Sequence, residues 1–110
     1  MYLPGDVVLL PFPFSDLSAS KKRPVLILRA TNSQGDFLAV QITSQPSYAN
    51  ALVLEQEDFR IGVLPKQSFV RPDKLITLNT SLVIHRMGQL TDDAMARIQK
   101  AVCVCLGCRR

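Results

Sequence analysis

Tryptophan is absent from the 110-residue sequence, and histidine occurs once, as His85. A single histidine excludes, within one chain, a mechanism in which one imidazole acts as general base and a second as general acid. The sequence also lacks a glycine-rich phosphate loop, a His-Glu-x-x-His metal motif and an Asp-x-Asp calcium loop. Any catalysis therefore relies on arginine, lysine, tyrosine, hydroxyl groups or carboxylates.

Long apolar runs and a secretion signal are lacking too. No apolar stretch approaches the roughly 18 residues that span a bilayer. The first six residues, Met-Tyr-Leu-Pro-Gly-Asp, contain neither a basic region nor a signal-peptide cleavage site. Hydrophobic residues make up 47% of the chain, which favours a folded protein over a disordered one. We therefore expect a cytoplasmic protein without a membrane partner, folded as a single domain over residues 1–110.

Cysteine is scarce and confined to the C-terminal end, at Cys103, Cys105 and Cys108. No second cysteine cluster or histidine pair completes a zinc site. We interpret the three as reduced cysteines on a helix, as is typical of cytosolic proteins. The sequence accordingly predicts no metal site and no cofactor.

Positive charge exceeds negative charge, with a net charge of +4. The excess is uneven, because residues 36–65 carry four acids against Arg60 alone, whereas residues 66–110 carry eight cations against three acids. A basic balance of this size favours an anionic partner only weakly.

Short apolar runs with many β-branched residues, separated by turns that contain glycine or proline, predict strands. We expect strands at residues 6–10, 24–29, 37–43, 51–54, 67–71, 74–78 and 82–86. The turn at 32–36 joins the second and third strands into a hairpin, and Pro72-Asp73 bends the chain between two later strands. Residues 11–20 form a loop, and residues 55–59 a single helical turn.

The C-terminal region has a different pattern. Thr91 is typical of a helix N-cap, the two acids after it suit the first turn of a helix, and Gly107 suits the C-cap. Apolar residues recur between them at helical spacing, which predicts a helix over residues 92–106. Several short strands followed by one helix indicate a mainly β protein, a small β-barrel with a C-terminal α-helix.

Several segments, in this order, resemble one protein family. They are Gly5–Val8, Phe12–Phe14 with Ser15-Asp16, Lys21–Leu28, Ile42–Gln45, Gly62–Ser68 and Asp73–Leu78. Together with the terminal helix, this sequence is similar to the MazF/PemK-type toxins of type II toxin–antitoxin systems. Arg23-Pro24 before an apolar strand, followed about twenty residues later by Thr43-Ser44, is the most specific part of the resemblance.

The resemblance implies an SH3-like barrel with a C-terminal helix, a homodimer, and a cognate antitoxin that binds over the groove at Arg23. It also implies metal-independent cleavage of single-stranded RNA at short sequences, leaving a 2′,3′-cyclic phosphate and a 5′-hydroxyl. The residues that match the catalytic pair of the family are Arg23 and Thr43. An antitoxin that bound without blocking RNA cleavage would contradict this location.

The chemistry of these two side chains suits the implied reaction. RNA that is cut without a metal uses its own 2′-hydroxyl as nucleophile, so DNA does not serve as substrate. Arg23 offers a planar fork of donors for two phosphate oxygens, and we assign it charge stabilisation. Thr43 donates its hydroxyl to the same phosphate or to the 2′ oxygen. If the hairpin turns near residue 33, antiparallel pairing brings Arg23 beside Thr43.

Residues near this pair are further candidates for RNA contact, namely Ser18, Ser20, Lys21, Lys22, Ser44 and Gln45. The segment Ser18–Lys22 replaces the longer Gly-Ser-Glu-Gln-type loop of the family, so it does not identify a general base. Tyr48 is a candidate base reader. We interpret Phe12 and Phe14 as core or dimer contacts rather than base-stacking groups.

Three cations farther along the chain, Arg71, Lys74 and Arg86, either extend an RNA track or are simply solvated.

Two other functions remain open at this point. A nonenzymatic nucleic-acid-binding barrel would hold phosphate at Arg23 without cutting, and the presence of Thr43-Ser44 argues against it. A topoisomerase poison of the CcdB type shares the fold but binds gyrase through a C-terminal Trp-Gly-Ile. This chain has no tryptophan and ends Leu106-Gly107-Cys108-Arg109-Arg110, which disfavours that function.

Overall fold

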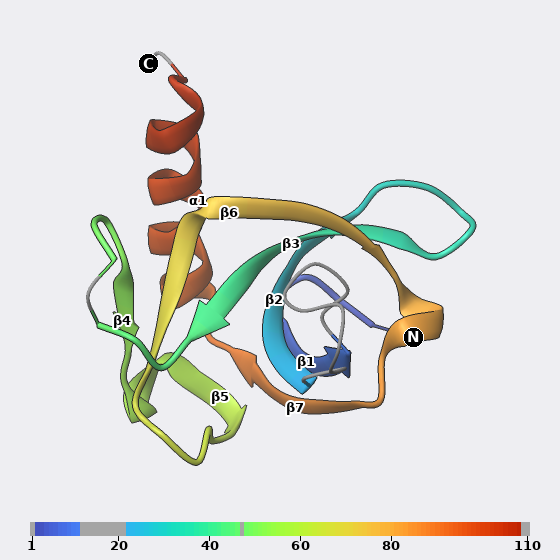
Figure 1. Ribbon diagram of the computed structural model, residues 1–110, viewed down its shortest axis with the longest axis horizontal. Helices are drawn as coiled ribbons and strands as arrows, with labels where there is room; N and C mark the ends of the chain where they lie inside the picture. Colours follow the sequence, from blue (N-terminus) through green and yellow to red (C-terminus); the bar gives the residue numbers. More distant parts are fainter. Residues whose placement is uncertain (1, 12–21, 47, 109–110) are drawn as a thin grey trace, which may run out of the picture.

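A computed structural model describes residues 2–11, 22–46 and 48–108 of the chain. Within these residues it contains seven strands, two 3₁₀-helices and one α-helix (Figure 1). In chain order they are β1 (Asp6–Pro11), β2 (Lys22–Ala30), β3 (Asp36–Thr43), β4 (Leu52–Leu54), η1 (Gln56–Asp58), β5 (Phe59–Gly62), β6 (Ser68–Asn79), η2 (Thr80–Leu82), β7 (His85–Leu90) and α1 (Asp92–Leu106).

The strands form one antiparallel sheet in the order β4-β6-β3-β2-β1-β7-β5. Figure 1 shows the sheet curling strongly, with β6 arching over one side of β2 and β3 and β7 passing along the other. The two end strands, β4 and β5, each pair with only one neighbour. The predicted class, a mainly β barrel with a C-terminal helix, is confirmed.

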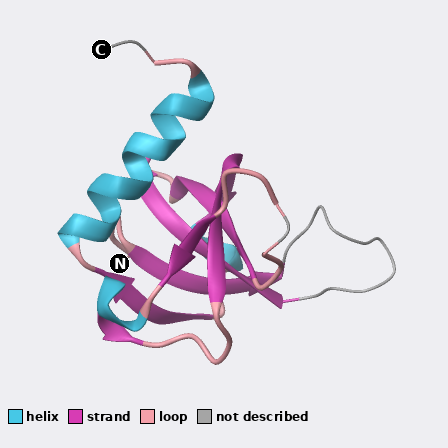
Figure 2. Ribbon diagram, turned by 90° about the vertical axis from the view of Figure 1, so that its left-hand side faces the viewer, coloured by secondary structure: helices cyan, strands magenta, loops and turns pink. Residues whose placement is uncertain are grey.

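Side chains alternate between the two faces of the sheet. One face, which we call the helix face, packs Leu26, Val40 and Ile42 against Ile98 and its neighbours on α1. Figure 2 shows α1 lying along one side of the curled sheet. The opposite face, which we call the far face, carries a second buried cluster that joins β1, β2, β3 and β6. Its buried members are Val8, Leu10, Val25, Ile27, Phe37, Ala39 and Leu78. Each fully buried aliphatic side chain contributes about 1.5–3 kcal/mol relative to an exposed one.

The C-terminal helix begins and ends where its capping signals predict. The Thr91 side-chain oxygen accepts a hydrogen bond from the backbone N–H of Ala94 at 3.2 Å. At the other end Gly107 has φ 78°, in the left-handed region where glycine carries no Cβ penalty. The predicted bounds of residues 92–106 are therefore confirmed.

The strand pattern departs from prediction at three places. Residues 68–79 form one strand, β6, instead of two, although its ladder with β3 jumps from Leu75 to Arg71, so Pro72-Asp73 makes a bulge rather than a break. The expected strand at 82–86 begins instead at His85, because residues 80–82 form η2. β5 was not predicted, since its four residues gain their order from pairing with β7.

The strands that flank the loop predicted at 11–20 are longer than expected. Pro11 pairs with Lys22 and Leu10 pairs with Arg23, so β1 extends to Pro11 and β2 begins at Lys22. Lys22 is therefore a strand residue. No helix among the described residues is long and apolar enough to cross a membrane.

Candidate functional site

Arg23 lies near the start of β2, opposite Leu10 of β1. It is half-buried, and its Nε atom is buried with no hydrogen-bond partner among the residues that the structure describes. A buried donor left without an acceptor costs about 1–3 kcal/mol, and more for a charged group. An anionic ligand would satisfy this donor, because a guanidinium fork matches the oxygens of a phosphate.

Thr43 is the last residue of β3, opposite Phe69 of β6, and only 7% of it is exposed. Its hydroxyl oxygen accepts a hydrogen bond from the backbone N–H of Gln45 at 3.1 Å. A hydroxyl carries one donor and two acceptor lone pairs, so this contact leaves the proton of Thr43 available for another acceptor. The contact also fixes the direction of the chain as it leaves β3.

The predicted hairpin register is confirmed for the residues that pair. Val25 faces Gln41, Leu26 faces Val40 and Ile27 faces Ala39, which is the register that, continued, sets Arg23 against Thr43. The ladder ends at Val25 and Gln41, however. Beyond it β2 stays with β1, whereas β3 stays with β6, and Figure 1 shows the start of β2 and the arrowhead of β3 diverging.

Arg23 and Thr43 nevertheless share one face. Arg23 alternates in phase with Val25 and Ile27, and Thr43 with Ala39 and Phe37, all members of the far-face cluster. The far face thus has an apolar end around Phe37 and a polar end that carries the two candidate catalytic side chains. Arg23 is placed by the pairing of β2 with β1, and Thr43 by the pairing of β3 with β6, so the two residues do not pair with each other.

The remaining predicted contact residues divide into two groups. Lys22, Ser44 and Gln45 are exposed and flank the candidate pair. The other three, Ser18, Ser20 and Lys21, lie outside the described residues, as do Phe12 and Phe14, which were predicted to be core or dimer contacts.

A cluster that the sequence did not reveal surrounds Arg71 on β6. The Arg71 guanidinium lies 3.7 Å from the ring centroid of Tyr48 and donates two hydrogen bonds to Asp73, from Nε at 3.2 Å and from a terminal nitrogen at 2.7 Å. Hydrogen bonding from Arg71 lowers the pKa of Asp73. Arg71 is therefore partnered within the protein rather than simply solvated. The Arg-x-Asp spacing was the only sequence signal for it.

Arg86 is also engaged. It contacts the fully buried Asp6 at 3.4 Å, and Asp6 further accepts hydrogen bonds from Gln89 and from the backbone N–H of Leu3. The Gly5-Asp6 motif thus fastens the start of β1 to β7. Of the three cations considered for an RNA track, Lys74 is exposed and is not in an ion pair among the described residues.

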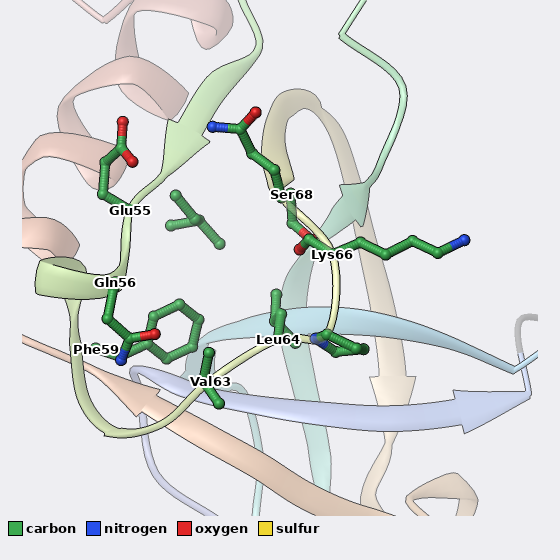
Figure 3. A pocket seen from close by; sticks show the side chains of 10 residues that line it. Glu55, Gln56, Phe59, Val63, Leu64, Lys66 and Ser68 are labelled. Carbon is green, nitrogen blue, oxygen red and sulfur yellow. The ribbon is translucent and has the colours of Figure 1, made fainter.

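A cavity of about 210 Å³ lies between the end of β4, η1 and the segment that precedes β6 (Figure 3). Its apolar lining comes from Leu54, Phe59 and Leu64, and Figure 3 shows the Lys66 side chain extending away from it. Leu54 belongs to the helix-face cluster, so this cavity lies on the other side of the sheet from Thr43.

A larger cavity of about 710 Å³ lies at the apolar end of the far face, lined by Ile27 and Phe37 among others. Asp36, Asn79 and Asn32 also line it, and hydrogen bonds from Asn79 and Asn32 lower the pKa of Asp36. Neither Arg23 nor Thr43 lines this cavity or the smaller one. The two cavities are therefore separate from the candidate catalytic pair.

The three cysteines at the end of α1 are exposed and carry free thiols. A hydrogen bond with Cys103 raises the pKa of the Cys108 thiol. In the described part of the chain, no group of three or more histidine, cysteine, aspartate or glutamate side chains is arranged to hold a metal ion.

Comparison with protein families gives a match over residues 3–106, to the family described as "PemK-like, MazF-like toxin of type II toxin-antitoxin system". No curated protein sequence matches the chain significantly.

Solved structures with the same fold are numerous, and three illustrate the range. An endoribonuclease of a mycobacterial species in complex with its cognate antitoxin has a TM-score of 0.73 at 21% identity, covering 99% of this chain and 96% of that one. MazE-MazF of Deinococcus radiodurans has a TM-score of 0.77 at 20% identity, covering 98% of both chains. Mycobacterium tuberculosis toxin MazF-mt6 has a TM-score of 0.70 at 17% identity, covering 96% of this chain and 99% of that one. At these identities the likeness shows the fold.

Proposed function

Because the chain belongs to the PemK-like, MazF-like toxin family of type II toxin–antitoxin systems, we propose that it is an endoribonuclease that cleaves single-stranded RNA, acting on mRNA in the cytoplasm. The observation that carries the proposal is the buried, unpartnered Nε of Arg23 on the same face as the Thr43 hydroxyl. Endoribonucleases with this fold occur among the similar structures, which supports the activity.

The reaction we propose is an internal transesterification. The 2′-hydroxyl loses its proton to solvent water as its oxygen attacks the adjacent phosphorus. The bond to the 5′-oxygen of the next nucleotide breaks, and that oxygen takes up a proton from water, so a 2′,3′-cyclic phosphate and a 5′-hydroxyl result. Arg23 stabilises the negative charge that develops on the phosphorane oxygens. Thr43 donates a hydrogen bond from its hydroxyl to one of these oxygens or to the 2′ oxygen, and its own oxygen accepts from the backbone N–H of Gln45.

Metal independence is part of the proposal. A guanidinium aimed at the phosphate supplies the charge stabilisation that a divalent cation supplies in other nucleases. Lys22, exposed next to Arg23, strengthens the attraction of the RNA backbone without sequence preference.

We also propose a homodimer and a cognate antitoxin as partners. The mycobacterial endoribonuclease and the Deinococcus MazF were both solved with an antitoxin, which supports the second partner. An acidic antitoxin segment that covered the Arg23 region would compete with RNA for the same guanidinium.

The experiment is incubation of the purified protein with a long single-stranded transcript in EDTA, followed by mapping of both ends at each cut. We expect discrete cuts, each with a cyclic phosphate upstream and a 5′-hydroxyl downstream. A transcript with 2′-deoxyribose at the mapped position serves as the matched substrate control and should stay intact. Intact RNA at high protein concentration would refute the enzymatic function and favour a nonenzymatic nucleic-acid-binding barrel.

A further inference from the structure

The ring of Tyr48 lies against a partnered arginine, outside the candidate catalytic pair. One face of its ring lies against the Arg71 guanidinium at 3.7 Å, and Arg71 is itself fastened by its two hydrogen bonds to Asp73. The Arg71 side chain is only 13% exposed. Tyr48 remains 40% exposed, so part of its surface is open to solvent although its ring is clamped from one side.

The cluster lies on the same side of the sheet as Thr43. Arg71 faces Gln41 across the β3–β6 ladder, and Gln41 and Thr43 alternate in phase on the far face. Tyr48 follows Thr43 by five residues, so their Cα atoms are at most about 18 Å apart, the reach of an extended chain. A single-stranded RNA held at Thr43 therefore needs only a few nucleotides to reach Tyr48.

The charges of the cluster suit a nucleobase better than a phosphate. Asp73 neutralises Arg71 at two points, which leaves little positive charge for an anion. An aromatic ring offers stacking to any base, because every base has a π-face. Because the Arg71 guanidinium already packs against one face of the Tyr48 ring, the side chain loses little rotational freedom when a base binds to the other face.

We propose that Tyr48 is a stacking platform for one unpaired nucleobase of the RNA substrate, with Arg71 and Asp73 as its positioning residues. The proposal rests on the proposed function, since the ligand is the RNA that Arg23 and Thr43 act on. Ser44 and Gln45, exposed between Thr43 and Tyr48, line the stretch of chain along which the nucleotides would pass.

The test uses a short single-stranded RNA that spans one mapped cleavage site, with 2′-deoxyribose at the scissile nucleotide so that it binds without being cut. A series of the same RNA carries one abasic nucleotide at each position in turn. For the wild-type protein, we expect the abasic nucleotide at one position near the cleavage site to weaken binding by about 5- to 150-fold. Tyr48→Ala should weaken binding of the intact RNA by a similar factor and be insensitive to that abasic nucleotide.

Matched variants separate stacking from other effects. Tyr48→Phe keeps the ring and should bind like wild type. Arg71→Lys keeps the charge but loses the planar fork, so it should show a smaller dependence on the same abasic position. Lys74→Ala removes a neighbouring exposed cation and should weaken all members of the series alike.

Two results would overturn the platform while leaving RNA cleavage intact. One is an equal response of wild type and Tyr48→Ala to every abasic position. The other is a Tyr48→Ala variant that loses affinity for the antitoxin alone. A wild-type protein that neither binds nor cuts RNA would refute the proposed function as well, so the two failures are distinguishable.

Discussion

Two arginines on one sheet have opposite surroundings. Arg71, at the bulge of β6, has its guanidinium against the ring of Tyr48 and bound twice to Asp73. Arg23, near the start of β2, has a buried Nε without a partner in the described part of the chain. The first arrangement satisfies a charge inside the protein, and the second leaves a charged donor for a ligand.

The difference teaches that charge alone does not identify a functional arginine. Both residues are cations on strands and both lie toward the polar end of the far face. What separates them is whether the folded chain already supplies acceptors, because a guanidinium that is already paired has fewer donors left for a phosphate. Substitutions at the two sites should therefore act on different properties, catalysis at Arg23 and binding or stability at Arg71.

The largest effect is expected for Arg23→Lys. Lysine keeps the positive charge but lacks the fork, so the cleavage rate under single-turnover conditions should fall by about 10²- to 10³-fold. The melting temperature should stay near that of wild type, since no described partner is lost. Equal rates for the variant and wild type would remove Arg23 from the catalytic pair.

Thr43→Val should have the next largest effect on cleavage. The loss of one hydrogen bond to a charged group, about 1.5–3 kcal/mol, corresponds to roughly 10- to 150-fold in rate. Valine also leaves the backbone N–H of Gln45 without its acceptor. Thr43→Ser retains both roles of the hydroxyl and should restore most of the activity, whereas a Ser variant as slow as the Val variant would argue for a packing role.

Arg71→Ala should shift stability rather than the chemical step. The variant loses the contact with Tyr48 and the ion pair with Asp73. We expect this to cost about 1 kcal/mol of unfolding free energy, because Tyr48 is 40% exposed and the Asp73 side chain 41% exposed. We expect a melting temperature lower by about 4 °C. Single-turnover rates at saturating RNA should be unchanged, and a drop comparable to that of Arg23→Lys would erase the contrast between the two sites.

The smallest effect is a pH dependence at Asp73. Hydrogen bonding from Arg71 lowers the carboxyl pKa from its ordinary value of 3.8 in the folded protein. The ion pair therefore stabilises the fold fully above that value, and its contribution disappears as the pH falls through the lowered pKa. The difference in melting temperature between wild type and Asp73→Asn should be present at neutral pH and should vanish in strong acid. A difference in melting temperature that stayed constant from neutral pH to strong acid would show that the contribution of Asp73 does not depend on its ionisation.

The sequence predicted those parts of the fold that depend on local signals. The N-cap at Thr91 and the left-handed C-cap at Gly107 each depend on a few residues adjacent in the sequence, so the helix bounds were predictable. The turn at 32–36 set the register of the β2–β3 hairpin for the same reason. The strand β5 was not predictable, because Gly62 approaches Gly88 of the distant β7 so closely that a Cβ there would lie 2.3 Å from the Met87 carbonyl oxygen.

For the candidate site, the sequence supplied the residues to consider but not their arrangement. The resemblance and the register selected Arg23 and Thr43 as candidates without a structure, and their catalytic roles stay a prediction. The divergence of the two strands depends on pairing of β2 with β1 and of β3 with β6, which no local pattern encodes. The apolar run at residues 82–84 suggested a strand, yet Leu82 and Ile84 are 39% and 46% exposed and lie in or next to η2.

Because the β2–β3 ladder ends at Val25 and Gln41, the distance between Arg23 and Thr43 can be changed without changing the pairing of β2 with β1. Arg23 is placed by β1, and Thr43 by β6, next to the bulge at Pro72-Asp73. A residue gained or lost in that bulge would move Thr43 while Arg23 kept its place. The gap between the two side chains can therefore be tuned from the β6 side without replacing either residue.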